Sequence, residues 1–328
     1  MKYQKPWKSF EEQLRLLKVR GMNIGEPNQA RSYLERIGYY RLSAYWYPFR
    51  TFQLEMNKQN NKLVLKAQDD FYKNTHFLDA VNLYLFDKSL RLSLTDALER
   101  IEIALRVDMA YLLGTKDAFA YRDKTLFHPT FANKKFRGKP AFEAWQEKYS
   151  GLLKRSKEDF VKHFHTRYPG EDLPIWIAIE IWDFGSMSQL FSMMQTKDQA
   201  QIAQKYGVQD FSVFASWLRS LNYLRNIVAH HSRLWNRNII DQPKLPNLGQ
   251  IEWCDNFIGK QDLIAKPFLL IAIVRHLILG ICPNTHWHIR IEQMLESFPE
   301  LKSDKTCSIK DMGAPENWQE WWTQKTPA

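Results

Sequence analysis

The chain has 328 residues, of which 45% are hydrophobic and 14% aromatic, so it can bury the core of one large domain or of two closely packed ones. Its 46 Lys and Arg residues exceed its 36 Asp and Glu residues and give a formal net charge of +10. Because the basic residues are spread along the chain, we expect a basic surface that favours a polyanionic partner, although an acidic membrane would satisfy the same charge.

The sequence argues against a membrane protein, a secreted protein and several enzyme classes. No apolar run approaches the ~20 residues of a membrane span, and the first residues lack the apolar run of a secretory signal. Cys254, Cys282 and Cys307 form neither a disulfide framework nor a Cys-x-x-Cys metal pair. A Walker A sequence, a dinucleotide glycine fingerprint and a Gly-x-Ser-x-Gly elbow are absent. We therefore expect a cytoplasmic protein without a membrane partner.

The N-terminal part of the chain predicts short helices and one polar segment. A helix over 10–20 is stopped by Gly21, another begins at Pro27, and Pro48 closes the helix that follows. Residues 51–66 are polar in the middle and alternate at the ends, which fits a hairpin or an exposed loop.

The middle of the chain contains the clearest amphipathic pattern. From Thr95 to Leu113 the apolar residues recur at steps of three and four, which predicts a helix that Gly114 ends. Residues 122–140 carry prolines, a glycine and many basic side chains, so we expect a surface excursion. Helices are predicted again over 141–165 and 174–195.

The C-terminal part predicts a long helix from Asp210 to about His231, then a proline-punctuated loop and helices over about 262–279 and 287–297. The tail contains Trp318, Trp321 and Trp322, which we expect to dock on the rest of the protein. The predicted fold is mainly α.

Polar side chains suited to phosphate chemistry gather where the helix over 210–231 is predicted to end. The segment Leu224–Arg237 contains Arg225, Asn226, His230, His231, Arg233 and Arg237. Asn226, His230 and Arg233 have the spacing of one helix face, and Arg225 lies about 140° around the helix from His230.

These residue types suit cleavage of RNA. Attack by a ribose 2′-hydroxyl on the adjacent phosphate needs a base, an acid for the departing 5′-oxygen, and positive charge on the phosphorane. Histidine can do either proton transfer near neutral pH, and arginine grips phosphate oxygens while it stays charged. No metal ion and no cofactor are required. In isolation, however, the motif favours a simpler interpretation, in which Arg225 and His230 are cations that suit a helix C-terminus.

The pattern Arg-Asn-x-x-x-His resembles the signature of HEPN ribonucleases, all-helical proteins that cut RNA as dimers. More of the chain resembles one HEPN branch, the bacterial abortive-infection (Abi-like) family. The resemblance is carried, in the family's order, by Ile37–Phe49, Leu83–Asp87, Asp96–Arg106, Pro174–Trp176, Phe184–Ser186 and Leu224–Arg237.

This resemblance implies a HEPN-type helical bundle with additional helices and a small hairpin or loop insertion. Residues 1–240 would form the Abi-like HEPN domain, with insertion-like loops near 51–68 and 122–140, and residues 241–328 a C-terminal helical extension packed on it. Arg225 would hold the scissile phosphate, His230 would be the acid or base, and Asn226 would orient one of them. His231 also fits the spacing, so the choice of histidine stays open.

One copy of the motif implies a homodimer. A single histidine cannot easily serve both the 2′-oxygen and the leaving oxygen, whereas a two-fold axis would place two copies face to face. The resemblance further implies a ribonuclease of phage defence or a toxin of a toxin–antitoxin system, controlled by a bound small structured RNA.

Other side chains are candidates for contact with RNA or for support of the site. Tyr39, Leu42, Trp46 and Phe49 have the spacing of a core stripe, which leaves neighbouring side chains to stack on bases. The expected RNA contacts are Arg233, Arg237, Tyr40, Arg41, Arg50, Lys134, Lys135 and Arg137. Glu102 and Arg106 lie on a charged helix face, and they would support the site if that helix packs beside the catalytic one.

Two competing functions remain open on the sequence. The protein could be a non-catalytic RNA-binding protein that holds a small non-coding RNA, with the Arg–His pair only gripping phosphate. It could also be a DNA-binding regulator, although no helix-turn-helix pattern is convincing. His163, His165, His286 and His288 suggest a metal site, but no Cys or carboxylate cluster completes a ligand set.

Overall fold

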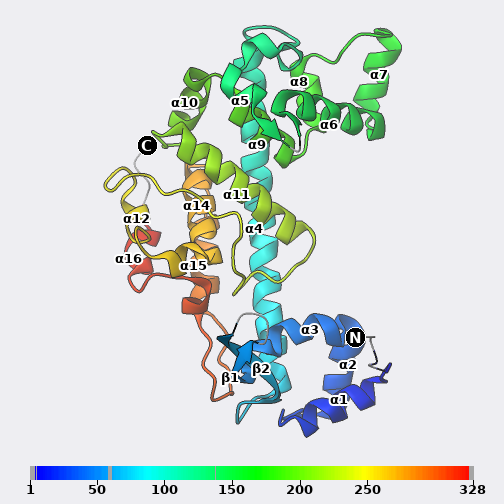
Figure 1. Ribbon diagram of the computed structural model, residues 1–328, viewed down its shortest axis with the longest axis vertical. Helices are drawn as coiled ribbons and strands as arrows, with labels where there is room; N and C mark the ends of the chain where they lie inside the picture. The colour runs from blue at the N-terminus through cyan, green and yellow to red at the C-terminus, as the bar shows by residue number, and fades with distance from the viewer. Residues whose placement is uncertain (1–3, 5, 58–60, 137, 325–328) are drawn as a thin grey trace. The chain divides into compact units, whose positions relative to one another are not determined.

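The computed structural model describes residues 4, 6–57, 61–136 and 138–324, and it confirms the mainly helical fold (Figure 1). By its internal packing the chain divides into two compact units. Unit 1 comprises Met1–Arg91 and Ile291–Asp311, and unit 2 comprises Leu92–Arg290 and Met312–Ala328. The predicted domain boundary near residue 240 stays a prediction.

Unit 1 is built from short helices, a hairpin and the first part of a long helix. Its elements are α1 (Phe10–Val19), α2 (Pro27–Ile37), α3 (Tyr39–Trp46), η1 (Tyr47–Phe49), β1 (Arg50–Asn57), β2 (Lys62–Phe71) and the start of α4 (Phe77–Gly114). Ser9 and Glu12 form a capping box that starts α1, and Gly21 follows its end with a φ of 92°. Pro27 occupies the first turn of α2, as predicted.

The strands β1 and β2 form a hairpin, one of the two forms that the sequence allowed. β1 and β2 pair antiparallel, with Leu54 opposite Leu65. The predicted core stripe beside it is largely confirmed, because Leu42, Trp46 and Phe49 are buried. A polar network lies in the same core: the Tyr45 hydroxyl donates to the Asp87 carboxylate over 2.6 Å, and Arg91 pairs with Asp87. Burial therefore raises the pKa of Tyr45.

Unit 2 consists of the rest of α4 and most of the remaining helices. In chain order these are η2 (Ala120–Arg122), η3 (Lys124–Leu126), α5 (Pro129–Asn133), β3 (Lys135–Phe136), β4 (Lys139–Pro140), α6 (Ala141–Arg155), α7 (Asp159–Arg167), α8 (Ile175–Ala178), η4 (Ile179–Ile181), α9 (Phe184–Met193), α10 (Thr196–Lys205), α11 (Phe211–Ala229), α12 (Glu252–Asp255), α13 (Gln261–Ile264), α14 (Pro267–Ile281) and α16 (Trp318–Trp322). Besides α4, two elements cross the division between the units, α15 (Trp287–Glu296) and η5 (Ile309–Met312).

Several helix boundaries differ from the prediction. The helix predicted over 95–113 is the second half of α4, which begins at Phe77. Its first half buries residues on more than one side, including Val81, Leu83 and Leu90, so no narrow apolar stripe marks it. The segment 141–165 is split by Ser156 into α6 and α7, and 174–195 is interrupted before α9, where Asp183 caps a new helix.

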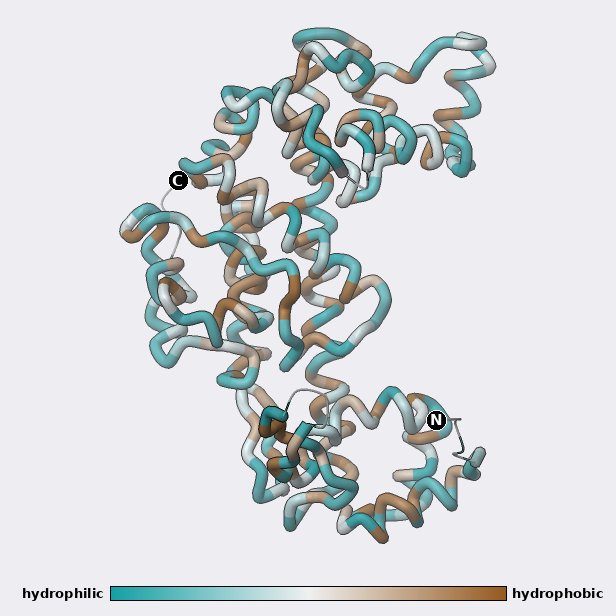
Figure 2. Tube along the Cα trace, in the orientation of Figure 1, coloured by the Kyte–Doolittle hydropathy of each residue, from teal (hydrophilic) through white to brown (hydrophobic). Residues whose placement is uncertain are grey.

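The core of unit 2 is formed by α9, α11 and α14. Along α14, every side chain from Pro267 to Ile278 is buried. Figure 2 shows hydrophobic colouring on α14 and hydrophilic colouring on the loop that crosses in front of it. The predicted docking of the tail is confirmed, because Trp318, Trp321 and Trp322 are buried and their rings pack around Phe268. None of the described helices combines the length and apolar character needed to cross a membrane.

Candidate functional site

The predicted site residues lie at the C-terminal end of α11 in unit 2. The helix starts at Asp210, whose carboxylate accepts from the Ser212 backbone, and it ends at Ala229. The His231 amide donates to the Val228 carbonyl and the Ser232 amide to the Ile227 carbonyl. These two bonds form a Schellman end, a turn that usually requires glycine.

Here His231 takes the place of that glycine, with a φ of 53°. Left-handed backbone is uncommon for other residues and is found at functional sites more often than elsewhere. Because the chain reverses at His231, Arg233 lies beyond the helix. The prediction that Asn226, His230 and Arg233 share one helix face was therefore wrong. The side chains of Asn226, His230 and His231 are exposed, and Arg225 is half-buried.

Arg225 is held by a chain of ionic contacts from α4. Its Nε lies 3.8 Å from Glu102 Oε2, and the exposed fractions of the two side chains are 40% and 13%. The other carboxylate oxygen of Glu102 accepts from Arg106 over 2.7 Å. The nearly buried Glu102 carboxylate thus lies between two guanidinium groups, and α4 packs beside α11 as the sequence hypothesis required.

Arg106 is fixed by partners that the sequence did not indicate. It also donates to the Trp182 carbonyl over 2.9 Å and to Glu180 over 3.3 Å. Both residues precede α9, and they lie between Pro174–Trp176 and Phe184–Ser186, two of the stretches that carry the family resemblance. A hollow of about 360 Å³ lies over this network and is lined by Glu102, Arg106 and Arg225. Arg225 therefore lines an open depression that extends to Ala229, the residue before His230.

The start of α9 explains the Phe-Gly-Ser sequence, which had been assigned no role. A Cβ on Gly185 would lie 3.2 Å from the Asn222 side-chain oxygen, so glycine permits close packing against α11. Asp183 caps α9 by accepting from Ser186, and it also pairs with Lys148 over 2.8 Å. Burial raises the pKa of Asp183, but Lys148 and the Ser186 hydrogen bonds outweigh it, and the net pKa is lowered.

The other predicted RNA contacts are distributed over both units. Arg237 donates to the Tyr223 hydroxyl over 3.1 Å, and its guanidinium lies over the same ring; Arg233 is half-buried next to it. In unit 2, Lys134 and Lys135 are exposed, and Arg137 lies outside the described residues.

Unit 1 contains the remaining candidates. Tyr40 and Arg41 are exposed there, whereas Arg50 pairs with Asp69 and is less available to a ligand.

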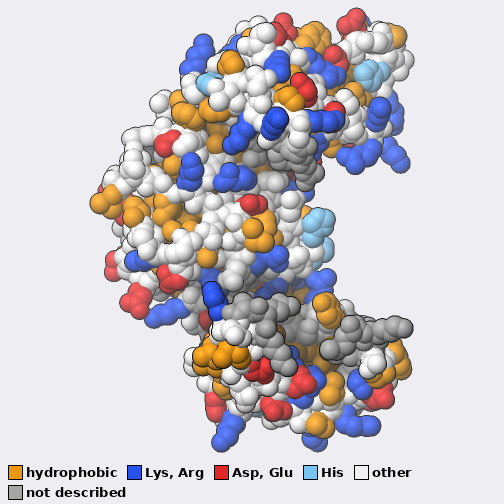
Figure 3. All heavy atoms as spheres, in the orientation of Figure 1, with side chains coloured by type: hydrophobic (Ala, Val, Ile, Leu, Met, Phe, Trp, Pro, Cys, Tyr) orange, Lys and Arg blue, Asp and Glu red, His pale blue; other side chains and the backbone are white. Residues whose placement is uncertain are grey.

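Figure 3 shows Lys and Arg side chains over the face that carries α5, α9 and α11, with histidine side chains at the surface near the end of α11. In the described ranges, no three His, Cys, Asp or Glu side chains are grouped so as to hold a metal ion.

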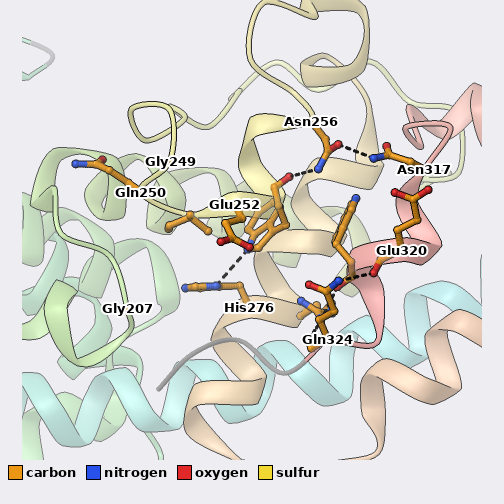
Figure 4. A pocket seen from close by; sticks show the side chains of 13 residues that line it. Gly207, Gly249, Gln250, Glu252, Asn256, His276, Asn317, Glu320 and Gln324 are labelled. Atoms are coloured by element: carbon orange, nitrogen blue, oxygen red, sulfur yellow. Dashed lines mark hydrogen bonds between the residues drawn. The ribbon is translucent and has the colours of Figure 1, made fainter.

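A separate cavity of about 420 Å³ lies between α14, the 249–256 segment and the C-terminal helix (Figure 4). His276 in its wall is buried, with one ring nitrogen 3.0 Å from the Tyr206 carbonyl and the other 3.3 Å from the Trp253 indole nitrogen. Burial lowers its pKa to about 4, so the ring is neutral near pH 7. Arg275 donates to carbonyls of Trp321 and Trp322. These contacts tie the C-terminal helix to the core.

Neither curated proteins nor solved structures gave a match to this chain. A family model described as Abi-like protein matches residues 32–236. The matched range contains α4, the start of α9 and the Arg225–His231 end of α11, together with Glu102 and Arg106. It covers more than half of the sequence, and the chain therefore belongs to the family of Abi-like proteins.

Proposed function

We propose that this protein is a metal-independent RNA endonuclease of HEPN type that acts in abortive infection, as a phage-defence enzyme or a toxin. The observation that carries the proposal is the end of α11, where exposed His230 and His231 follow an arginine that Glu102 holds in place. Membership in the Abi-like family supports the role in abortive infection.

The chemistry follows from these side chains. The guanidinium of Arg225 would bind the scissile phosphate and stabilise the charge of the phosphorane. An imidazole would take the proton of the ribose 2′-hydroxyl or give one to the departing 5′-oxygen. The new bond joins the 2′-oxygen to phosphorus as the bond from phosphorus to the 5′-oxygen breaks. The products would be a 2′,3′-cyclic phosphate and a 5′-hydroxyl.

A homodimer would bring two such helix ends together, and an apolar surface beside the site supports it. Ile103, Val107 and Tyr111 have the spacing of one face of α4 and are 50%, 60% and 77% exposed. Trp176, 55% exposed, lines a hollow together with Val107 and Tyr111. Arg106 lines both this hollow and the depression at Arg225. A second copy seated here would cover the apolar stripe and bring its own helix end near the first.

Cleavage in the presence of EDTA tests the proposal. Purified protein should cut RNA and leave cyclic phosphate ends, as read by end-specific ligation and mass spectrometry. Arg225→Ala and His230→Ala should each abolish cutting while RNA binding remains, and His231→Ala is the matched control that decides between the histidines. Full activity in the Arg225→Ala, His230→Ala double variant would contradict the assignment.

RNA recovered with the inactive variant addresses control by a small RNA. If His230→Ala protein carries one abundant structured RNA, that RNA is the expected regulator. Tight, salt-sensitive binding without cleavage of any cellular RNA would instead favour the non-catalytic RNA-binding function.

A further inference from the structure

A second groove, of about 270 Å³, lies beside the first half of α11 in unit 2. Its walls come from α5, α9, α10, α11 and the segment that contains Lys244. Its lining is mostly hydroxyl, amide and cationic side chains, among them Ser188, Ser212, Gln199 and Arg219. The groove does not include any residue of the candidate cleavage site.

Ser216 links the Arg219 side chain and the Lys244 backbone on this groove. The Ser216 hydroxyl accepts from the Lys244 backbone amide over 2.8 Å, and Arg219 Nη2 lies 3.4 Å from the same oxygen. The Trp217 indole donates to the Lys244 carbonyl over 2.9 Å. The backbone of Lys244 is thus attached to α11 on both sides, and the exposed Lys244 lines the same groove as Arg219.

The positive charge of this pair is not neutralised within the described ranges. No Asp or Glu oxygen there lies within 4.0 Å of the Arg219 or Lys244 side-chain nitrogens. Two like charges that line one groove without a counter-charge repel each other, and an anion bound in the groove reduces that repulsion. Arginine and lysine together are a common binding set for phosphate.

Gln199 supplies a second, independent indication of a ligand. Its side chain is 1% exposed, and its amide nitrogen donates to the Phe191 carbonyl over 2.6 Å, which fixes the orientation of the amide. The other end, Oε1, has no hydrogen-bond partner among the described residues. A buried carbonyl oxygen without a donor is unfavourable, and a small movement of Gln199 toward the groove that it lines would bring this oxygen to a hydroxyl or amino group of a ligand.

The position of the groove relates it to the cleavage site. Arg219 precedes Asn226 by seven residues and His230 by eleven, which returns to nearly the same face of the helix. At 1.5 Å per residue these positions are about 10 Å and about 16 Å further along α11. A nucleic acid strand that follows this face would pass from the groove to the histidines.

We propose that this groove is a subsite for one nucleotide of single-stranded RNA. Arg219 and Lys244 bind its phosphate, and Gln199 accepts a hydrogen bond from a ribose hydroxyl or a base amine. The inference rests on the proposed function, because it names a binding position for the strand that the α11 end would cut. It also selects single-stranded RNA, rather than a closed duplex, as the substrate class.

Binding to protein that cannot cut tests the subsite separately from the nuclease. With His230→Ala as the parent, fluorescence anisotropy would measure the affinity for a labelled single-stranded RNA at several salt concentrations. Arg219→Gln with Lys244→Gln should weaken binding on the order of 10-fold and flatten the dependence of log affinity on log salt by about 1. Lys154→Gln with Arg155→Gln, which removes the same charge from the exposed end of α6, is the matched control.

The outcomes distinguish the subsite proposal from the nuclease proposal, and they distinguish RNA from inorganic phosphate as the ligand of the groove. Unchanged affinity and salt slope in the Arg219, Lys244 variant would overturn the subsite. Loss of inorganic phosphate binding in that variant, without loss of RNA affinity, would overturn it too. If the variant loses RNA affinity while the wild-type protein cuts no RNA, the subsite stands and the nuclease proposal fails. Gln199→Met, which keeps the size but removes the acceptor, should weaken RNA binding without changing the salt slope.

Discussion

At the scale of single residues, Glu102 is the side chain that positions Arg225 in the candidate site. Its carboxylate is 13% exposed and lies between Arg225 and Arg106, so it neutralises charge that would otherwise repel and it limits where Arg225 can lie. A cation that must meet a phosphate gains from such restraint, because less freedom is lost when the substrate binds. The sequence placed Glu102 on a charged helix face, and the fold gives it this contact.

We expect Glu102→Gln to lower kcat by about 10- to 100-fold, since a small displacement of a group that contacts the reacting phosphate is enough for such losses. KM should change little, and Glu102→Asp should recover part of the rate. Single-turnover cleavage of a labelled RNA would measure both. Glu99→Gln, one turn earlier on α4 and lining the same depression, is the control. Equal rates for Glu102→Gln and Glu99→Gln would show that Glu102 does not position Arg225.

At the element scale, the end of α11 is decided by backbone conformation. The Schellman bonds require a left-handed residue at 231, and the chain supplies histidine where glycine is usual. That turn separates His230, at the helix terminus, from His231, in the reversal. The two neighbouring imidazoles therefore leave the backbone in different directions, and they are not interchangeable.

Substitutions at 231 should follow the tolerance of each side chain for positive φ. Asparagine accepts this conformation, whereas a β-branched residue does not. We expect His231→Val to lower the free energy of unfolding by about 1–2 kcal/mol more than His231→Asn does. Urea denaturation followed by circular dichroism would measure the difference. Identical stabilities of the two variants would mean that the turn is not formed in solution.

On the scale of the whole molecule, one motif per chain needs a partner that carries another. The exposed stripe of Ile103, Val107 and Tyr111 adjoins the Arg225 depression through Arg106, so association there would place two sites close together. A net charge of +10 opposes the approach of two copies at long range, and bound RNA would reduce this repulsion.

Acidic substitutions on the exposed apolar stripe of α4 should therefore prevent the association of two copies of the protein. Val107→Asp with Tyr111→Asp should shift the protein to monomer in sedimentation velocity and abolish RNA cleavage, because two buried carboxylates cannot be desolvated without partners. Leu248→Asp, at an exposed apolar residue elsewhere in unit 2, should change neither property. An active monomer would contradict the dimeric site.

Local sequence patterns were enough to predict several elements of this protein and its family. Spacing and helix-terminal residues predicted α1, α2 and the hairpin alternative, because these features depend on neighbours within a few residues. The Arg-Asn-x-x-x-His segment and the accompanying stretches led to the family, and the family model confirms it. Boundaries failed where side chains are buried on several sides, as in the first half of α4, or where a backbone turn overrides periodicity, as at His231.

Contacts between distant segments had to come from the tertiary structure. Glu102 and Arg225 are far apart in sequence, and so are Arg106 and Trp182; no periodicity within one helix reveals which face of another helix it meets. The presence of Arg219 and Lys244 on one groove likewise depends on a loop that returns to α11 through Ser216 and Trp217. Residue types determined which chemistry is available to this chain, and packing decided which of those side chains meet.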